Sequence, residues 1–137
     1  MHIYCRVFVV LLCSCLMKGV DCAYGQSLRF DHLTLEEGLS ESTVLAVTQD
    51  AEGFIWFGTR EGLNRYDARH IKVYRHDPVD PESLSDNFIY SLVSDSQERL
   101  WVGTRTGLNL FNSSTGHFKR YYSNPAKLSS LSDNTVT

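Results

Sequence analysis

Past residue 22 the sequence contains no cysteine, because all four (Cys5, Cys13, Cys15 and Cys22) lie close to its start. Neither a disulfide framework nor a cysteine metal site is therefore expected in the body of the chain. Positive charge is not in excess either, since 13 Lys and Arg residues stand against 16 Asp and Glu residues, for a formal net charge of −3. Without a basic stripe, contact with nucleic acid by this segment is not expected.

The first residues have the three-part pattern of a secretory signal peptide. Arg6 gives a positive start, residues 7–17 form an apolar run, and small residues at Ala23 and Gly25 offer a cleavage site. The apolar run is well short of the roughly 20 residues that a membrane-spanning helix needs. The sequence therefore predicts a signal peptide over residues 1–25 and an exported mature protein.

A lipid anchor is the alternative interpretation of this leader. Cys22 stands near the predicted cleavage site, but Asp21 before it is a poor fit to the small residue that a lipoprotein signal requires. The Leu-Cys-Ser-Cys stretch that ends at Cys15 fits better, yet it leaves a very short apolar run. Lipidation is thus the less favoured of the two.

The body of the chain is a tandem repeat. Residues 39–67 align with residues 84–112 at a constant offset of 45. Extra residues near Ser114 then shift the offset to 47, and the Leu-Ser-Asp-Asn sequence of residues 84–87 recurs at 131–134. The identical pairs are Leu39 and Leu84, Ser40 and Ser85, Asp50 and Asp95, Trp56 and Trp101, Gly58 and Gly103, Thr59 and Thr104, Arg60 and Arg105, Gly62 and Gly107, Leu63 and Leu108, and Asn64 and Asn109.

Each copy reads as four short strands separated by turn residues. Aromatic and β-branched residues dominate the second strand of each copy, in FIWFGTR and RLWVGTR. The fourth strand alternates polar and aromatic residues with a period of two. The expected strands of the first copy are residues 44–50, 54–60, 62–67 and 71–76, and those of the second are residues 89–95, 99–105, 107–112 and 118–123.

Four strands every 45 to 47 residues, with tryptophan and glycine in fixed places, are the signature of a propeller blade. The sequence therefore predicts an all-β protein, an incomplete β-propeller of two four-stranded blades. Repeat 1 spans residues 39–83, repeat 2 spans residues 84–130, and residues 131–137 begin a third repeat. The preceding residues 26–38 contain a strand, 28–35, that we expect to close the propeller by joining a blade from the other end of the protein.

A propeller closes with about four to eight blades, so this sequence is expected to be the start of a longer polypeptide. The downstream blades are then the first partners of this segment. Alone, residues 26–137 are expected to unfold with poor cooperativity or to associate, because open blade faces expose aromatic surface and leave a sheet edge unpaired.

The repeated residues have structural interpretations that outweigh functional ones. Trp56 and Trp101 are expected to fill the space between adjacent blades rather than to stack on sugars, because ligand platforms seldom recur at equivalent blade positions. Asp50 and Asp95 are expected to cap hairpin turns rather than to act in catalysis.

Two further features concern the turns. Thr59 and Thr104 are expected to bond neighbouring backbone groups. Gly53 supplies a glycine to the first hairpin turn, whereas Glu98 stands at the equivalent position of the second copy. The second turn must therefore be built differently or carry some strain.

The block Asp-x-x-Gly-x-Ile/Leu-Trp-x-Gly-Thr-x-x-Gly-Leu-Asn resembles the two-component regulator propeller repeat. It runs from Asp50 to Asn64 and again from Asp95 to Asn109, where Glu98 departs from the glycine. The resemblance implies the periplasmic sensor region of a hybrid two-component histidine kinase, a homodimer in the inner membrane that responds to oligosaccharides. Kinase activity is implied for the whole protein only. No catalytic residue, ligand-binding residue, metal or cofactor is assigned to this segment.

Two other classes of function stay open. A secreted or surface-held propeller that binds carbohydrate or protein would have no membrane segment downstream. A propeller enzyme would need convergent carboxylates or a His/Tyr pair at the mouth of its channel. No pair of polar residues repeats in that way, and the histidines, His76 included, lack the spacing of metal ligands. The candidate residues for an enzyme site are Asp31, His32, Glu36, Glu37, His70 and His117.

Overall fold

The computed structural model describes residues 32–137, so the predicted signal peptide and residues 26–31 lie outside the described residues. Within residues 32–137 the chain forms eight β-strands in two four-stranded antiparallel sheets. This range contains no helix, and hence none that is long and apolar enough to cross a membrane. The predicted all-β class and the two unclosed blades are confirmed.

The first sheet, blade 1, is built from residues of the first repeat. Its strands follow one another in space in the order of the sequence, so each turn joins neighbouring strands. Trp56 lies opposite Thr48 and Arg65, which puts these three side chains on one face of the sheet. The strands are β1 (Ala46–Gln49), β2 (Ile55–Gly58), β3 (Leu63–Tyr66) and β4 (Ile71–Tyr74).

The second sheet, blade 2, has the same topology. Trp101 lies opposite Val93 and Leu110, so it occupies the face that is equivalent to the Trp56 face of blade 1. All eight observed strands overlap the ranges expected from the sequence. The strands of blade 2 are β5 (Ile89–Ser94), β6 (Leu100–Thr104), β7 (Leu108–Asn112) and β8 (His117–Tyr121).

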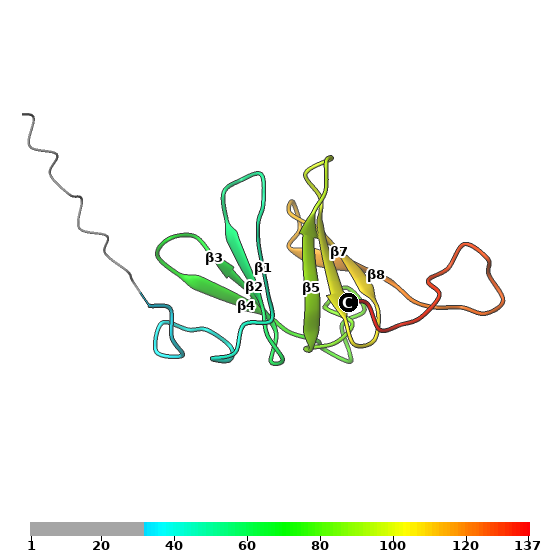
Figure 1. Ribbon diagram of the computed structural model, residues 1–137, viewed down its shortest axis with the longest axis horizontal. Coiled ribbons are helices and arrows are strands. Elements are labelled where there is room, and N and C mark those ends of the chain that lie inside the picture. Colours follow the sequence, from blue (N-terminus) through cyan, green and yellow to red (C-terminus); the bar gives the residue numbers. More distant parts are fainter. Residues whose placement is uncertain (1–31) are drawn as a thin grey trace, which may run out of the picture. The chain divides into compact units, whose positions relative to one another are not determined.

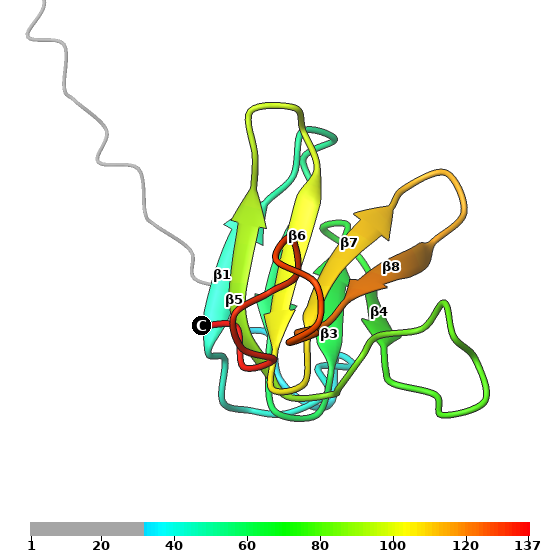
Figure 2. The ribbon, with the colours of Figure 1, turned by 90° about the vertical axis from the view of Figure 1, so that its right-hand side faces the viewer.

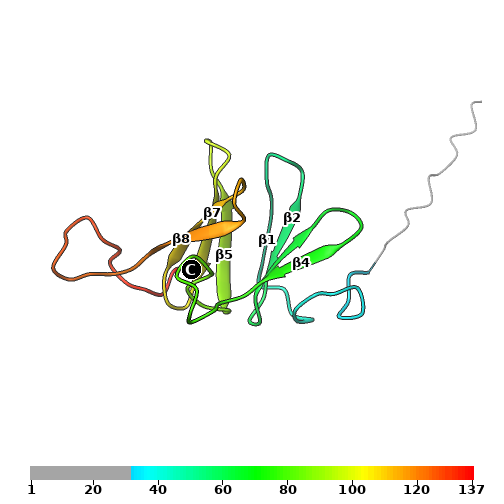
Figure 3. The ribbon, with the colours of Figure 1, turned by 180° about the vertical axis from the view of Figure 1, so that it is seen from behind.

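The two blades meet along their first strands. β1 and β5 lie side by side, and the later strands of each blade diverge from this inner edge (Figure 1). The view from behind shows the same divergence (Figure 3). This is the arrangement of neighbouring propeller blades, which radiate from a central channel.

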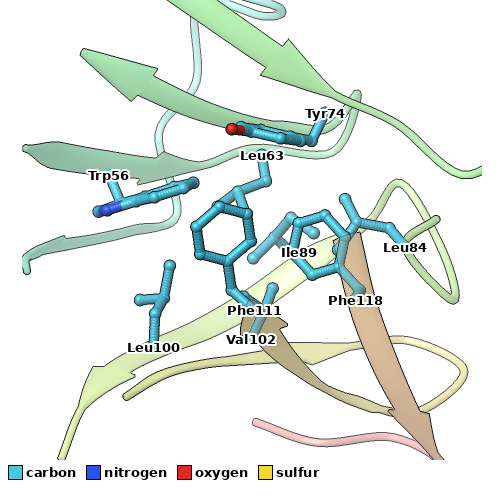
Figure 4. Packing of buried hydrophobic residues seen from close by; sticks show 9 residues of the cluster. All are labelled: Trp56, Leu63, Tyr74, Leu84, Ile89, Leu100, Val102, Phe111 and Phe118. Carbon is cyan, nitrogen blue, oxygen red and sulfur yellow. The ribbon is translucent and has the colours of Figure 1, made fainter. Parts of the chain in front are cut away.

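The hydrophobic core lies between the two sheets (Figure 4). Burying one face of a sheet on its neighbour removes apolar surface from water, which stabilises the pair by roughly 25 cal/mol per Å². The buried side chains are Trp56, Leu63 and Tyr74 of blade 1, Leu84 of the connection, and Ile89, Leu100, Val102, Phe111 and Phe118 of blade 2.

Aromatic rings form the middle of this core. Trp56 stacks on Tyr74 with 5.7 Å between ring centroids, and it meets Phe111 of the other blade edge-on at 4.9 Å. Tyr74 also meets Phe111 and Phe118 edge-on, both at 5.5 Å. Each such pair adds about 0.5–1.5 kcal/mol beyond the buried area. The prediction that Trp56 fills the space between adjacent blades is confirmed.

The opposite faces of the two sheets are less covered. On blade 2, Trp101 is half-buried, with Tyr121 at 5.8 Å between ring centroids and Leu108 lining the same hollow. On blade 1, Ile55 and Phe57 of the outward face are also only half-buried. Each blade thus has one covered and one open apolar face within residues 32–137.

Backbone hydrogen bonds at the inner edge join each blade to the next repeat. The Ile89 amide at the start of β5 donates to the Thr59 carbonyl at 2.8 Å. The Val136 amide donates to the Thr104 carbonyl at 3.0 Å, so residues 131–137 run in the same register. Figure 2 shows this last segment beside β5, where Ser91 Oγ also donates to the Val136 carbonyl.

The predicted closure strand, residues 28–35, lies partly outside the described residues. Its last part, residues 32–35, pairs with neither sheet. A turn follows, in which the Gly38 amide donates to the Leu35 carbonyl at 3.1 Å. Because the expected partner strand belongs to another blade, closure by this segment stays a prediction.

Candidate functional site

An aspartate at the hairpin turn of each blade holds the tryptophan of that blade. In blade 1, Asp50 accepts one hydrogen bond from a turn amide at 2.9 Å and one from Trp56 Nε1–H at 2.7 Å. In blade 2, Asp95 accepts from a turn amide at 3.0 Å and from Trp101 Nε1–H at 2.8 Å. The predicted turn-capping role of both aspartates is confirmed. Their bonds to the indoles, which fix the orientation of each ring, were not predicted.

These contacts lower the pKa of Asp95 well below its ordinary value. The Trp101 indole N–H is the largest cause, and the backbone amide and guanidinium of Arg99 add to it, while partial burial opposes them. Arg99 Nη2 lies 2.7 Å from Asp95 Oδ2. The carboxylate therefore stays ionised, as an acceptor for the indole, far into acid pH.

A buried polar network ties the start of each repeat to its own blade. The Asn64 amide group accepts from the Ser40 backbone N–H and donates to Ser40 Oγ, both at 2.8 Å. Ser40 Oγ lies 2.8 Å from Thr59 Oγ1, which donates to the Gly62 carbonyl at 3.0 Å. The predicted bonding of the threonine hydroxyls to nearby backbone is confirmed, so these repeated polar groups serve the fold. The same contacts in blade 2 join Ser85, Thr104, Gly107 and Asn109.

The second hairpin turn is built like the first and carries the strain. φ is 62° at Glu98 and 90° at Gly53, so both residues lie in the left-handed region. A residue with a side chain costs roughly 1–2 kcal/mol there, because its Cβ crowds the following carbonyl oxygen. Of the two alternatives left open by the sequence, the strained turn is the one observed.

One group of side chains at the junction of the blades is not repeated. Phe88 lies just before β5, with Arg60 Cζ at 5.7 Å and Arg105 Cζ at 5.9 Å from its ring centroid. The two arginines occupy equivalent positions in the β2–β3 and β6–β7 turns. Tyr90, on β5, lies 4.5 Å from Phe88 between ring centroids. We call Arg60, Phe88, Tyr90 and Arg105 the Arg–Phe cluster.

Backbone and carboxylate contacts hold this cluster in place. The Arg105 amide donates to the Phe88 carbonyl at 3.1 Å, and the Phe88 amide donates to Asp86 Oδ1 at 2.8 Å. Asp86 Oδ2 lies 3.2 Å from Arg105 Nε, in an ion pair. The Arg60 amide donates to Glu41 Oε2 at 2.9 Å. Both arginine side chains are exposed, so their guanidinium groups are accessible to a ligand.

Arg60, Phe88 and Arg105 of the Arg–Phe cluster line an open hollow of about 430 Å³. Its wall is mixed in charge, because it combines two guanidinium groups with two carboxylates. The lining is polar except for the Phe88 ring, and it offers hydrogen-bond donors and acceptors that can orient a small polar ligand. The lining residues are Arg60, Glu61, His76, Asp86, Asn87, Phe88 and Arg105.

The acidic residues considered for an enzyme site lie elsewhere. Asp31 is outside the described residues, and His32 is exposed. Glu37 caps the first turn, where its carboxylate accepts from the hydroxyl and the amide of Thr34, and these bonds lower the pKa of Glu37. Glu36 is exposed in the same turn. This turn therefore has a structural explanation.

The histidines are also dispersed. His70 lies 3.7 Å from Asp67 in the β3–β4 turn, and His117 lies 3.0 Å from Glu82 at the start of β8. His76 Nδ1 lies 2.7 Å from a backbone carbonyl of the connection between blades. Within residues 32–137, no three His, Cys, Asp or Glu side chains are grouped as metal ligands. Of the described sequence candidates, Glu36 and Glu37 share the first turn, whereas His70 and His117 are paired with Asp67 and Glu82 in other parts of the fold.

The Arg–Phe cluster was not predicted, although the repeat contains a signal for it. The position of Phe88 is occupied by Thr43 in the first copy and by Thr135 in the third. Tyr90 departs in the same way from Leu45 of the first copy. Phe88 and Tyr90 are therefore aromatic in the second copy alone among the described residues.

Known proteins match the chain over its repeats. The family profile described as two component regulator propeller matches residues 38–61 and 83–106. Histidine kinase P4 of Formosa agariphila is 40% identical over 77 residues, which cover 56% of this chain and 6% of that protein.

Solved structures match the fold. The extracellular domain of a hybrid two component system of B. thetaiotaomicron is 36% identical, with a TM-score of 0.70 over 78% of this chain and 15% of that chain. The extracellular domain of a second such system of the same organism is 28% identical, with a TM-score of 0.50 over 57% of this chain and 11% of that chain. The chain thus spans a small part of the relatives it matches. It carries two repeats of the two component regulator propeller family.

Proposed function

We propose that this chain is part of the extracytoplasmic ligand-sensing propeller of a hybrid two-component sensor histidine kinase, and that the sensor responds to oligosaccharides. The observation that carries the proposal is the match, in sequence and in fold, to the extracellular domain of a hybrid two component system. In this proposal the kinase activity and the anchor in the inner membrane belong to other parts of the whole protein.

Further blades of the same polypeptide are the first partners of this segment in the proposal. The Trp101 face of blade 2 is equivalent to the Trp56 face of blade 1, which is covered by a neighbouring sheet. The Val136 amide repeats the inner-edge hydrogen bond made by Ile89. Both observations support a third blade that covers the Trp101 face with the same kind of contacts.

Sensing in this proposal rests on differential affinity. A ligand that binds one arrangement of the extracytoplasmic region better than another shifts the population toward it, by at most the difference in binding free energy. In a homodimer, that shift passes across the membrane as a change in how the paired chains are arranged. The close-packed core between blades supports this mechanism, because a densely packed interior transmits strain.

The test is autophosphorylation of the full-length protein, reconstituted in proteoliposomes and supplied with ATP and Mg²⁺. We expect at least one of a panel of four- to six-unit oligosaccharides to change the rate severalfold, while the corresponding monosaccharides leave it unchanged. A protein that binds an oligosaccharide but never autophosphorylates would instead be a binding propeller without kinase output. A protein whose kinase responds to no saccharide would contradict the assigned ligand class.

A further inference from the structure

We infer that the Arg–Phe cluster is the binding site for one sugar unit of a neutral oligosaccharide. The inference names the contact residues of the proposed sensor and therefore rests on the proposed function. It follows from three features of the molecule, which are an aromatic surface, a balanced polar rim, and a position that spans two blades.

The aromatic surface is the ring of Phe88, which lines the hollow, and Tyr90 packs against it. Phe88 and Tyr90 lie 4.5 Å apart between centroids, at an interplanar angle of 35°, and each is half-buried. Tyr90 thus supports the Phe88 ring from outside the lining. The C–H face of a pyranose is apolar enough to lie against an aromatic ring, while the sugar hydroxyls point outward to polar groups.

The polar rim offers both donors and acceptors. Arg60 and Arg105 present N–H donors, Asp86 and Glu61 present carboxylate acceptors, and Asn87 carries both kinds of group. A sugar hydroxyl donates and accepts, so adjacent hydroxyls can pair with a guanidinium and a carboxylate together. Two positive and two negative groups balance within the lining, which favours a neutral ligand over an acidic one.

Part of the rim is also held in place by contacts within the protein. Asp86 bonds the backbone of Phe88 and the side chain of Arg105, so the ring and one guanidinium are held by a single carboxylate. Positioned groups lose little conformational freedom on binding, which leaves more of the interaction energy for affinity. Because Arg60 belongs to blade 1 and Arg105 to blade 2, a sugar in this site contacts both blades.

The aromatic pair occurs at one blade junction in the described residues. Thr43 and Thr135 stand where Phe88 stands, and Leu45 stands where Tyr90 stands. The Phe88 ring is therefore specific to this blade junction, which agrees with its assignment as a contact for one sugar unit.

The experiment is titration calorimetry on the intact extracytoplasmic region that contains this chain. The probes are gluco-, xylo-, manno- and galacto-oligosaccharides of four to six units, together with oligogalacturonate as an acidic probe. Phe88→Thr installs the residue of the other two copies, so the fold is expected to tolerate it. Phe88→Tyr keeps the aromatic face, and Arg69→Ala, at an exposed arginine of the β3–β4 turn, is the matched control for Arg60→Ala.

We expect Phe88→Thr and Arg60→Ala each to raise the Kd of the bound neutral oligosaccharide at least tenfold without lowering the melting temperature. Phe88→Tyr and Arg69→Ala should stay within twofold of the unsubstituted protein. Binding that is unchanged in Phe88→Thr and Arg60→Ala would overturn this site while leaving the proposed sensor intact. Binding of oligogalacturonate alone would overturn the neutral class, and binding of none of the probes would overturn the site and the ligand class of the sensor together.

Discussion

Trp56 and Trp101 occupy the same position of the same repeat, yet they differ in exposure. Trp56 is 0% exposed between two sheets, whereas Trp101 is half-buried on a face that no sheet of the described residues covers. Each indole makes the same hydrogen bond to its own aspartate. The contacts inside a blade are therefore complete in both copies, and the difference lies only in the neighbour. The hydrophobic core of this fold forms between neighbouring blades. Each blade contributes one face to the core on either side of it.

The largest expected effect is the difference in stability loss between truncation of Trp56 and truncation of Trp101. Trp56→Ala should cost about 3–5 kcal/mol, as truncation of a buried aromatic does. Trp101→Ala should cost roughly 1 kcal/mol in the same chain, because its ring has much less surface to lose from burial. Urea unfolding of the two variants gives the measurement. Equal losses would mean that the core does not lie between the blades.

Gly58 and Gly103 precede the repeated threonines at the inner edge. Substitutions there test the same difference between a blade with a complete neighbour and a blade without one. A Cβ on Gly58 would lie 2.6 Å from Ile89 Cγ2, so Gly58→Ala should destabilise by about 1–3 kcal/mol. A Cβ on Gly103 would meet Ser91 Oγ and the Val136 carbonyl, but residues 131–137 have no blade of their own to hold them. Gly103→Ala should therefore cost less than Gly58→Ala in thermal melts of residues 26–137. A larger loss of stability for Gly103→Ala than for Gly58→Ala would contradict the equivalence of the two inner-edge contacts.

A smaller effect is expected where the second blade departs from the first in its hairpin turn. Glu98→Gly removes a side chain from a left-handed position and should stabilise the protein by about 1 kcal/mol. Glu52→Gly, one residue before the glycine of the first turn, is the control, and it should give no stabilisation. Chemical denaturation of both variants checks the prediction. A neutral result at Glu98 would mean that the turn of blade 2 relaxes elsewhere.

The smallest expected effect is the response of the Asp95–Trp101 hydrogen bond to low pH. Since folding lowers the pKa of Asp95, its contribution to stability is present above the ordinary value of 3.8 and is lost as pH falls through the lower folded value. The Trp101 Nε1–H signal in NMR should therefore keep its position through pH 3.8 and move only in stronger acid. Asp95→Asn should displace that signal at neutral pH. A titration of the signal with a midpoint near 3.8 would show that the carboxylate does not hold the indole.

Much of the fold could be predicted from the sequence, because the pattern that predicts each strand and turn occurs in both copies of the repeat. The strands, the turn-capping aspartates and the tryptophan between blades all follow from patterns local to one repeat. The bond from Asp50 to the Trp56 indole could not be predicted, since it depends on the rotamer of a large ring. The Arg–Phe cluster could not be predicted either, because Arg60 meets Phe88 only when two blades are placed side by side.

The most direct test of a core made between blades is the solvent exposure of Trp101 with and without a following blade. Hydroxyl-radical footprinting with peptide mass spectrometry reads Trp56 and Trp101 separately. It can be applied to residues 26–137 alone and to the longer protein that carries a third blade. Trp101 should be modified severalfold faster than Trp56 in the short chain, and as slowly as Trp56 in the longer protein. A Trp101 that reacts equally fast in both would contradict the account.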